Sequence, residues 1–210
     1  MPRYARLTAP NLFYHIFNRG IEKKPIFKKS HDYTKFLDFL KRYKVQFDWN
    51  VYCYCLMPNH FHLLIQTKND SLGEIMQSLQ TAYGVYFNKN YQRVGPVFSG
   101  RYKSIICQKD EYLMQVSKYI HLNPVKAGLV KTPAEYQYSS YKEYIDKNNN
   151  YLIDKRLMKR ILGDKLSNKA MKNYRSFVEE REDLFVYEPF DKSVEIFGNN
   201  KFVTKLSKIS

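Results

Sequence analysis

Two histidines separated by a single residue are the first candidates for chemistry in this sequence. His60 and His62 lie in a β-rich run over residues 60–67, in which alternate side chains point to opposite faces of a sheet. Both imidazoles therefore project from one face, while Phe61 and Leu63 point to the other. This geometry is typical of a metal chelate. It is also compatible with partly exposed imidazoles that hydrogen-bond to their neighbours.

A tyrosine and an asparagine four residues apart form a second candidate pair. Tyr119 and Asn123 lie near the end of a predicted helix, so that both side chains share one helical face. An amide oxygen can complete a metal shell, and a phenol can attack phosphorus once it is deprotonated or polarised. The same residues also fit a structural role, in which Tyr119 continues an apolar stripe and Asn123 ends the helix before Pro124.

The cysteines near the histidine pair raise an alternative metal. If Pro58 and Asn59 form a two-residue turn, Cys55 lies opposite His62 on the same face, with Cys53 one pair further along. Cysteine and histidine together favour Zn²⁺. Against this stands the usual behaviour of a free cysteine, which is that of a small buried hydrophobe.

The apolar periodicity predicts the elements that must position these side chains. Ser30 is expected to cap the first helix, Ser71 and Glu74 to form a capping box at the second, and Pro124 to stop the third. The predicted order is strand, helix, strand, strand, helix, strand and a further helix, over residues 12–17, 30–47, 49–56, 60–67, 71–86, 102–107 and 110–122. This order predicts an α+β fold, a ferredoxin-like split βαβ sandwich with a central antiparallel sheet, and an additional helix packed beyond it.

The pattern loosens after residue 131. We expect a catalytic-type domain over residues 1–145 and a basic, mostly helical C-terminal extension over residues 146–210, with helices over residues 154–162 and 168–180. The extension carries a second group of basic residues: Lys155, Arg156, Lys159, Arg160, Lys165, Lys169 and Lys172.

The charge of the chain favours a polyanionic partner. Thirty-five Lys and Arg residues against twenty Asp and Glu residues give a formal net charge of +15, which places nucleic acid first among partners. No stretch approaches the roughly 20 apolar residues of a membrane span, and the start lacks the apolar region of a secretory signal. Three cysteines predict no disulfide framework and a reducing cytoplasm. The nineteen Tyr and fourteen Phe fit either a core or stacking on unpaired bases.

Several segments resemble a known family. Residues 58–64, Pro-Asn-His-Phe-His-Leu-Leu, resemble the His-hydrophobic-His (HUH) signature of the IS200-like, single-tyrosine (Y1) transposases. Residues 119–130, Tyr-Ile-His-Leu-Asn-Pro-Val-Lys-Ala-Gly-Leu-Val, are similar to the nucleophile segment of their relatives, the REP-associated tyrosine transposases. Residues 14–20, 95–98 with 101–102, and 138–141 are further similar stretches, so the resemblance spans roughly residues 10–145 in family order.

The resemblance implies an endonuclease and strand transferase that acts as a transposase. In it, His60, His62 and Asn123 hold one Mg²⁺ or Mn²⁺ that polarises the scissile phosphate, and Tyr119 attacks to give a 5′-phosphotyrosine and a free 3′-OH. A second 3′-OH can reverse the step and join strands. The mobile IS200-type enzymes carry Gln where this chain has Asn123, whereas the Asn-Pro form resembles the REP-associated branch, which implies palindromic repeats as the substrate.

The resemblance also implies single-stranded DNA as the partner, in the form of a hairpin or palindromic repeat. The basic group of the extension then fits either a duplex stem or an ordinary solvated helix face. A monomer and a homodimer both stay open. The candidates for contact with phosphates flank the first strand and the Gly-Pro loop: Arg19, Lys23, Lys24, Arg93, Arg101 and Lys103.

Two other functions compete with this one. The first is a non-catalytic ferredoxin-like module that reads single strands by stacking, which would need aromatic residues on an exposed sheet face. The His60 and His62 pair occupies that central strand instead. The second is a domesticated copy that binds repeats and no longer cuts them, which Asn123 permits.

Overall fold

We describe the fold from a computed structural model, which covers residues 9–68, 71–109, 111–146, 152–155, 167–180 and 195–207. None of the helices in these ranges is long and apolar enough to cross a membrane.

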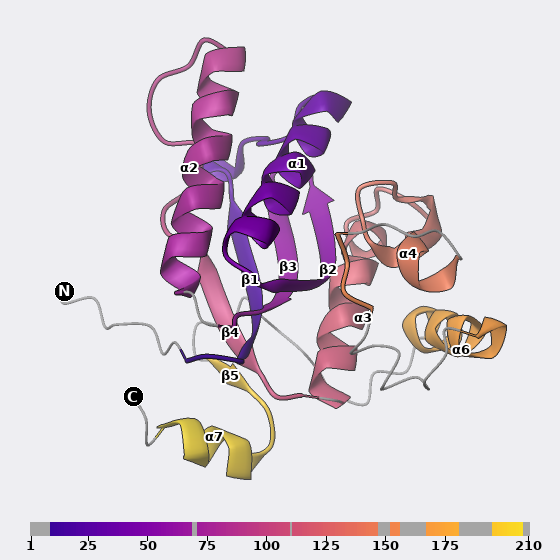
Figure 1. The fold of residues 1–210 in the computed structure, drawn as a ribbon. Helices are drawn as coiled ribbons and strands as arrows, with labels where there is room; N and C mark the ends of the chain where they lie inside the picture. Colours follow the sequence, from indigo (N-terminus) through magenta and orange to yellow (C-terminus); the bar gives the residue numbers. More distant parts are fainter. Residues whose placement is uncertain are drawn as a thin grey trace.

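A five-stranded sheet forms the centre of the fold (Figure 1). Its order is β2-β3-β1-β4-β5, in which the first four strands are antiparallel and the short β5 pairs in parallel with β4. The strands are β1 (Phe13–Arg19), β2 (Asn50–Met57), β3 (His60–Gln66), β4 (Lys103–Cys107) and β5 (Ile196–Phe197). The predicted ferredoxin-like arrangement is therefore confirmed, and β5, which the sequence did not predict, makes the sheet mixed.

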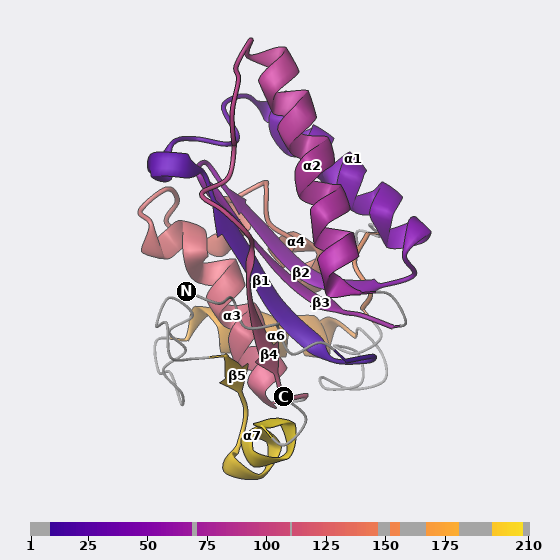
Figure 2. The ribbon, with the colours of Figure 1, turned by 90° about the vertical axis from the view of Figure 1, so that its left-hand side faces the viewer.

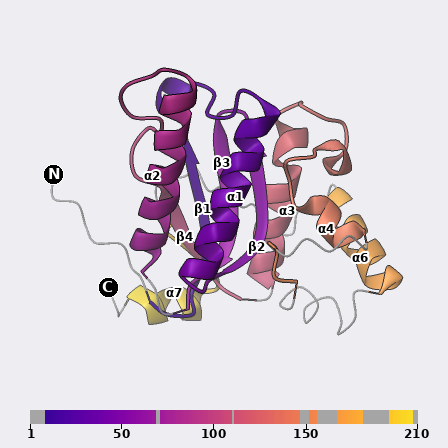
Figure 3. The same cartoon turned by 45° about the horizontal axis from the view of Figure 1, so that its top comes forward.

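Helices cover both faces of the sheet. In Figure 2 the sheet is seen between α1 and α2 on one side and α3 on the other, and Figure 3 shows α1 and α2 side by side across the strands. The helices are α1 (Ser30–Gln46), α2 (Leu72–Asn90), α3 (Glu111–Lys126), α4 (Tyr141–Ile145), α6 (Asn168–Glu179) and α7 (Asn200–Ser207), with short 3₁₀ turns η1 (Ile21–Lys23) and η2 (Pro133–Glu135).

Period-two alternation divides the strand residues between two cores. Phe61 of β3 points to the α1 and α2 side, where its ring lies 5.1 Å from that of Phe36, which in turn contacts Tyr83. Burying each such ring contributes about 1.5–3 kcal/mol. Among the described residues, the exposed large hydrophobic side chains are three valines and one leucine, with no aromatic. The described aromatic residues thus serve mainly as core.

The start of α1 differs from the prediction. The helix begins at Ser30, and Lys29 rather than Ser30 is its N-cap residue. The buried carboxylate of Asp32 takes the place of a hydroxyl cap, because it accepts hydrogen bonds from the backbone N–H groups of Lys28 and Lys29, at 2.8 and 3.0 Å. At α2 Ser71 is the N-cap residue as expected, but its hydroxyl accepts from the Gly73 N–H rather than from the Glu74 N–H, so a simple hydroxyl cap takes the place of the predicted capping box.

The prediction that Pro124 stops the third helix is wrong. Helix α3 continues through this residue to Lys126. Proline removes one N–H donor, which costs little in a last turn that is completed by other hydrogen bonds. Here the Ala127 N–H donates to the Asn123 carbonyl at 3.0 Å and the Leu129 N–H to the Pro124 carbonyl at 2.9 Å, while Gly128 adopts a positive φ of 68° that ends the helix.

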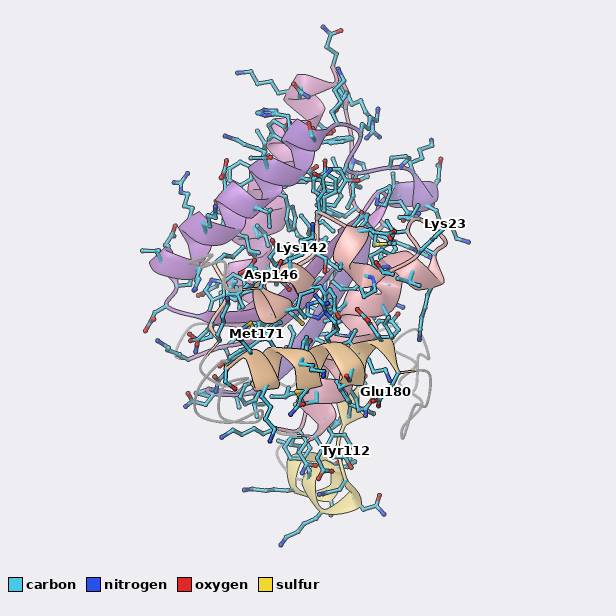
Figure 4. All side chains as sticks on the ribbon, turned by 90° about the vertical axis from the view of Figure 1, so that its right-hand side faces the viewer. Lys23, Tyr112, Lys142, Asp146, Met171 and Glu180 are labelled. Carbon is cyan, nitrogen blue, oxygen red and sulfur yellow. The ribbon has the colours of Figure 1, made fainter. Side chains whose placement is uncertain are left out.

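The C-terminal part packs against the same sheet and helices. Helix α6, predicted over residues 168–180, is confirmed and lies against α3 and α4 (Figure 4), whereas the helix expected over residues 154–162 lies largely outside the described residues. The short strand β5 pairs with the edge of β4 that faces away from β1. At the opposite edge, residues 138–140 pair with β2, where the Leu56 N–H donates to the Tyr138 carbonyl at 2.9 Å.

Candidate active site

Antiparallel pairing places both histidines of β3 beside β1 on the sheet face that α3 covers. His60 lies opposite Arg19 and His62 opposite Phe17, so these four side chains share that face. The ring centres of the two histidines are 5.0 Å apart and their planes nearly perpendicular, at 88°. His62 is fully buried, and His60 is half-buried.

Helix α3 brings its tyrosine and asparagine to these imidazoles. The centre of the Tyr119 ring lies 5.6 Å from that of His62, and the Asn123 Oδ1 atom lies 3.3 Å from His60 Nε2. Both are half-buried, and they extend from adjacent turns of one helix, as their spacing predicts. The ammonium group of Lys126 lies 5.4 Å from the centre of the Tyr119 ring. One helix of the same chain thus supplies a phenol, an amide and a cation to the histidine pair.

A third imidazole, His15 of β1, joins the group. Its Nε2 atom lies 2.9 Å from His62 Nδ1, and its ring is stacked on that of His62 with centres 5.0 Å apart. Burial lowers the pKa of His15 to about 3. Burial also lowers the pKa of His62, and the proximity of His15 and His60 lowers it further. The buried imidazoles are therefore neutral at physiological pH.

The surroundings of His60 suit a cation. Its Nδ1 atom lies 2.7 Å from Asn59 Oδ1, while its Nε2 atom faces Asn123 Oδ1. Burial lowers the pKa of His60, against the opposing effect of Asn123 and with a smaller lowering by Arg19. A neutral imidazole has a single N–H and cannot donate to both amide oxygens. A divalent ion between Nε2 and Oδ1 would satisfy both lone pairs, so the donor set fits a metal.

The zinc alternative does not gain support from the thiols. Cys55 lies opposite His62 as the two-residue turn predicts, and Cys53 lies opposite Leu64. However, burial raises the pKa of Cys55, and its Sγ contacts the sulfur of Met57 at 3.7 Å. Within the described ranges, no group of three or more His, Cys, Asp and Glu side chains is arranged to hold a metal. All three cysteines are buried and free of disulfides, as expected.

The predicted phosphate-binding residues fall into two groups. Arg19 and Lys103 are exposed and lie on the face of the histidine pair, opposite His60 and Phe17. Arg101 precedes β4 in the same neighbourhood, where the Gly100 carbonyl accepts a hydrogen bond from Asn18 of β1.

The other candidates lie further out. Lys23 and Lys24 are in the turn after β1, and the Lys24 ammonium lies 2.6 Å from the Glu22 carboxylate. The Arg93 guanidinium lies against the ring of Phe87 in α2, at 5.6 Å, so it belongs to the helical layer of the opposite face. In Figure 4 Lys23 lies well above Tyr112, which is at the start of α3, and α3 runs from Tyr112 toward the side of the molecule that carries Lys23.

The other side of α3 is anchored to the C-terminal part. His121 is fully buried, with Nδ1 2.7 Å from the Tyr174 hydroxyl of α6 and Nε2 2.9 Å from the Ser140 hydroxyl. The Tyr174 hydroxyl donates to Ser117, and the Lys118 ammonium donates to the Glu180 carbonyl at 2.9 Å. This network fixes the helix that carries Tyr119 and Asn123.

Two neighbours of the histidine pair, His15 and Asn59, are not among the site residues predicted from the sequence. His15 was not singled out, because its contact with His62 depends on the register between β1 and β3. Asn59 was treated only as part of a turn, although its position next to His60 could have suggested a contact. The relevant signal for His15 is its alternation with Phe17 in a predicted strand.

Comparisons with known proteins identify the family of this chain. The family profile described as "Transposase IS200 like" matches residues 8–123. A curated protein of Haemophilus influenzae, whose name assigns it to the REP-associated tyrosine transposases, is 31% identical over 98 residues, which are 41% of this chain and 56% of that protein. The chain thus matches little more than half of that relative.

A solved structure, that of a REP-associated tyrosine transposase bound to a REP hairpin, has a TM-score of 0.59 at 14% identity, over 73% of this chain and 98% of that one. At this identity the likeness shows a common fold. The profile match covers more than half of the residues, and the chain therefore belongs to the IS200-like transposase family.

Proposed function

We propose that this protein nicks and joins single-stranded DNA through a covalent bond between Tyr119 and a 5′-phosphate, at a site where His60, His62 and Asn123 hold Mg²⁺ or Mn²⁺. The main support for the proposal is the contact between side chains of α3 and β3. The Tyr119 ring lies 5.6 Å from the His62 ring while Asn123 Oδ1 lies 3.3 Å from His60 Nε2. A nucleophile and a donor set for a cation thus lie side by side.

The chemistry divides strand transfer into two displacements at phosphorus. When bound, the ion supplies Lewis-acid stabilisation of charge on the phosphate oxygens. The Tyr119 oxygen forms a bond to phosphorus, the bond from phosphorus to the 3′ oxygen breaks, and that oxygen leaves as a 3′-OH while the phenol loses its proton. Lys126, with its ammonium 5.4 Å from the ring centre, stabilises negative charge on the phenol. Attack by another 3′-OH releases Tyr119 and joins strands.

We further propose a DNA hairpin or palindromic repeat as the substrate. The net charge of +15 favours DNA, and the exposed Arg19 and Lys103 lie on the sheet face of the histidine pair. The similar solved structure is described as bound to a REP hairpin. These two basic side chains are positioned to contact the phosphates that flank the scissile bond.

A module that only binds single strands is less consistent with the fold. Such a module needs an open sheet face with exposed aromatic residues, but α3 covers the face that bears His60 and His62. Within the described residues, no aromatic side chain is among the exposed large hydrophobic ones. A domesticated copy that binds without cutting would retain the same fold, so only an assay of cleavage separates it from the active enzyme.

The test is formation of a covalent adduct. The wild-type protein is incubated with a hairpin oligonucleotide labelled at its 3′ end, with Mg²⁺, Mn²⁺ or EDTA, and adducts are resolved under denaturing conditions. We expect an adduct with either ion and none with EDTA. Tyr119→Phe should form no adduct and yet bind the hairpin within about twofold of wild type, because only a hydroxyl is lost and the ring contacts remain.

Tyr112→Phe is the matched control, since this tyrosine lies two turns earlier in α3, at its other end. It should form the adduct as wild type does. An undiminished adduct from Tyr119→Phe would exclude Tyr119 as the nucleophile. An adduct in EDTA would exclude the metal, and hairpin binding without any wild-type adduct would favour the binding-only alternatives.

A further inference from the structure

Both candidate metal-binding imidazoles have their Nδ1 atom in contact with a neighbouring side chain. His60 Nδ1 lies 2.7 Å from Asn59 Oδ1, and His62 Nδ1 lies 2.9 Å from His15 Nε2. A cation bound by this pair would therefore be bound through Nε2 of both rings. His60 Nε2 is also the atom that faces Asn123 Oδ1.

We propose that His15 and Asn59 are positioning residues, which fix the tautomer and ring orientation of His62 and His60 so that both rings direct an Nε2 lone pair to the cation. This inference rests on the proposed metal site. Histidine ligands commonly donate their second N–H to an acceptor, and loss of such an acceptor typically costs 10- to 100-fold in metal affinity. Here the acceptors are an amide oxygen and a third imidazole.

The orientation of Asn59 is set by its other contacts. Its Nδ2 donates to the Lys23 carbonyl at 3.1 Å, so that Oδ1 is the atom turned toward His60. The Asn59 carbonyl in turn accepts from the Gly20 N–H at 2.8 Å. A Cβ atom on Gly20 would lie 2.1 Å from the Lys24 carbonyl oxygen, so only glycine lets the chain turn back so closely between residues 20 and 24. The acceptor for His60 is thus part of a rigid pair of turns.

The orientation of His15 is set by burial in the central strand. It is fully buried on β1, opposite Leu64, and its ring lies 5.1 Å from that of Phe17. Two neutral imidazoles in contact share one proton between the facing nitrogens. When His62 presents a lone pair at Nε2, its Nδ1 carries the proton and donates it, and His15 accepts at Nε2 and holds its own proton at Nδ1.

The choice of acceptors affects the charge of the site. A carboxylate that accepted from Nδ1 of a metal-binding histidine would add a negative charge to the site, whereas an amide and an imidazole add none. The proposed ligands, two histidines and Asn123, are also neutral. The cation would therefore keep its full charge for the DNA phosphate, at the expense of affinity in the absence of DNA.

The tautomers can be observed directly. In protein labelled with ¹⁵N in its histidines, two-bond ¹H–¹⁵N spectra distinguish a ring protonated at Nδ1 from one protonated at Nε2, with or without metal. We expect His60 and His62 to carry the proton at Nδ1, and His62 in His15→Leu to show a mixture. An Nε2–H tautomer for His62 in the wild-type protein would overturn the proposal without reference to metal binding.

Metal affinity supplies the second measurement. Free Mn²⁺ is followed by electron paramagnetic resonance during titration of the full chain. We expect His15→Leu and Asn59→Ala to bind Mn²⁺ about 10- to 100-fold more weakly than wild type, and His15→Gln, which keeps an acceptor, to remain within about threefold. Leu64→Ala is the control, because it opens a cavity beside His15 on the same face and leaves the contact with His62 in place.

The outcomes separate this proposal from the one on which it rests. Wild-type affinity in both His15→Leu and Asn59→Ala would overturn the positioning roles and leave the metal site standing. Equal Mn²⁺ binding by wild type and His60→Ala would overturn the metal site itself. An equally large loss in Leu64→Ala would show that packing, rather than the acceptor at position 15, determines the affinity, and would also overturn the proposal.

Discussion

In the proposed metal site, the length of the side chain at position 123 should determine how tightly the cation is bound. Octahedral Mg²⁺ has ligand distances of about 2.0–2.1 Å, so that two adjacent ligands lie about 3.0 Å apart. Asn123 Oδ1 lies 3.3 Å from His60 Nε2, which is within a few tenths of an ångström of that separation. Asparagine therefore already has the required reach.

Asn123→Gln adds one methylene, about 1.5 Å of chain, and its carbonyl must fold back to reach the same point. Fixing the additional rotatable bond costs about 0.5–1 kcal/mol, so we expect Mn²⁺ binding about two- to fivefold weaker than in wild type. Asn123→Ala removes the oxygen altogether. The loss of a polar contact to a charge is worth about 1.5–3 kcal/mol, which corresponds to roughly 10- to 150-fold.

The assay is a titration with Mn²⁺ followed by electron paramagnetic resonance, with thermal unfolding as a check of the helix. The backbone of residue 123 should be unaffected, because its carbonyl accepts from the Ala127 N–H in every variant. Wild-type affinity in Asn123→Ala would show that the amide is no ligand. Binding by Asn123→Gln tighter than wild type would refute the argument from side-chain length.

Two further predictions concern the nucleophile and the core. Lys126→Gln should slow adduct formation about two- to fivefold, because the Lys126 ammonium lies 5.4 Å from the centre of the Tyr119 ring. The Mn²⁺ affinity should be unchanged, because Lys126 is not a ligand. An unchanged rate of adduct formation would show that Lys126 has no part in the mechanism. For the buried Asp32, burial acts to raise the carboxyl pKa, but hydrogen bonds from the Tyr86 and Tyr91 hydroxyls and two backbone N–H groups outweigh it and lower the pKa. A carboxyl group whose pKa is lower in the folded than in the unfolded protein stabilises the fold at pH values above the unfolded-state pKa. This stabilisation is lost as the pH falls through the folded-state pKa. Urea unfolding of Asp32→Asn should therefore show a loss of about 2 kcal/mol at pH 7 that shrinks below about pH 4; a loss independent of pH would contradict this assignment.

Local periodicity was sufficient to predict much of the candidate site. The alternation in residues 60–67 places His60 and His62 on one face of the strand, regardless of how that strand pairs with its neighbours. The spacing of four residues likewise places Tyr119 and Asn123 on one side of a helix. Each pair depends only on the type of element that carries it, which explains why both predictions could be made.

The contacts between elements could not be predicted in the same way. His15 meets His62 only because β1 pairs with β3 in one register, and a shift by one residue would turn its ring to the other face. The docking of Tyr174 on His121 joins residues 53 apart in sequence. The two-residue strand β5 is too short to show any periodicity. The continuation of α3 through Pro124 could not be predicted, because the free-energy cost of a proline in a helix depends on how near it lies to the helix end.

The covered edges of the sheet limit how this protein can associate with itself. Strand edges with unpaired N–H and C=O groups act as templates for another chain. Here the Ile106 N–H donates to the Glu195 carbonyl and the Leu56 N–H to the Tyr138 carbonyl, so the edges of β4 and β2 that face away from the centre of the sheet are covered by the chain's own segments. Two copies could pair directly along β4 or along residues 54–56 of β2 only after residues 195–197 or 138–140 were displaced. A homodimer that keeps this fold would therefore be held together by surfaces other than these two strand edges.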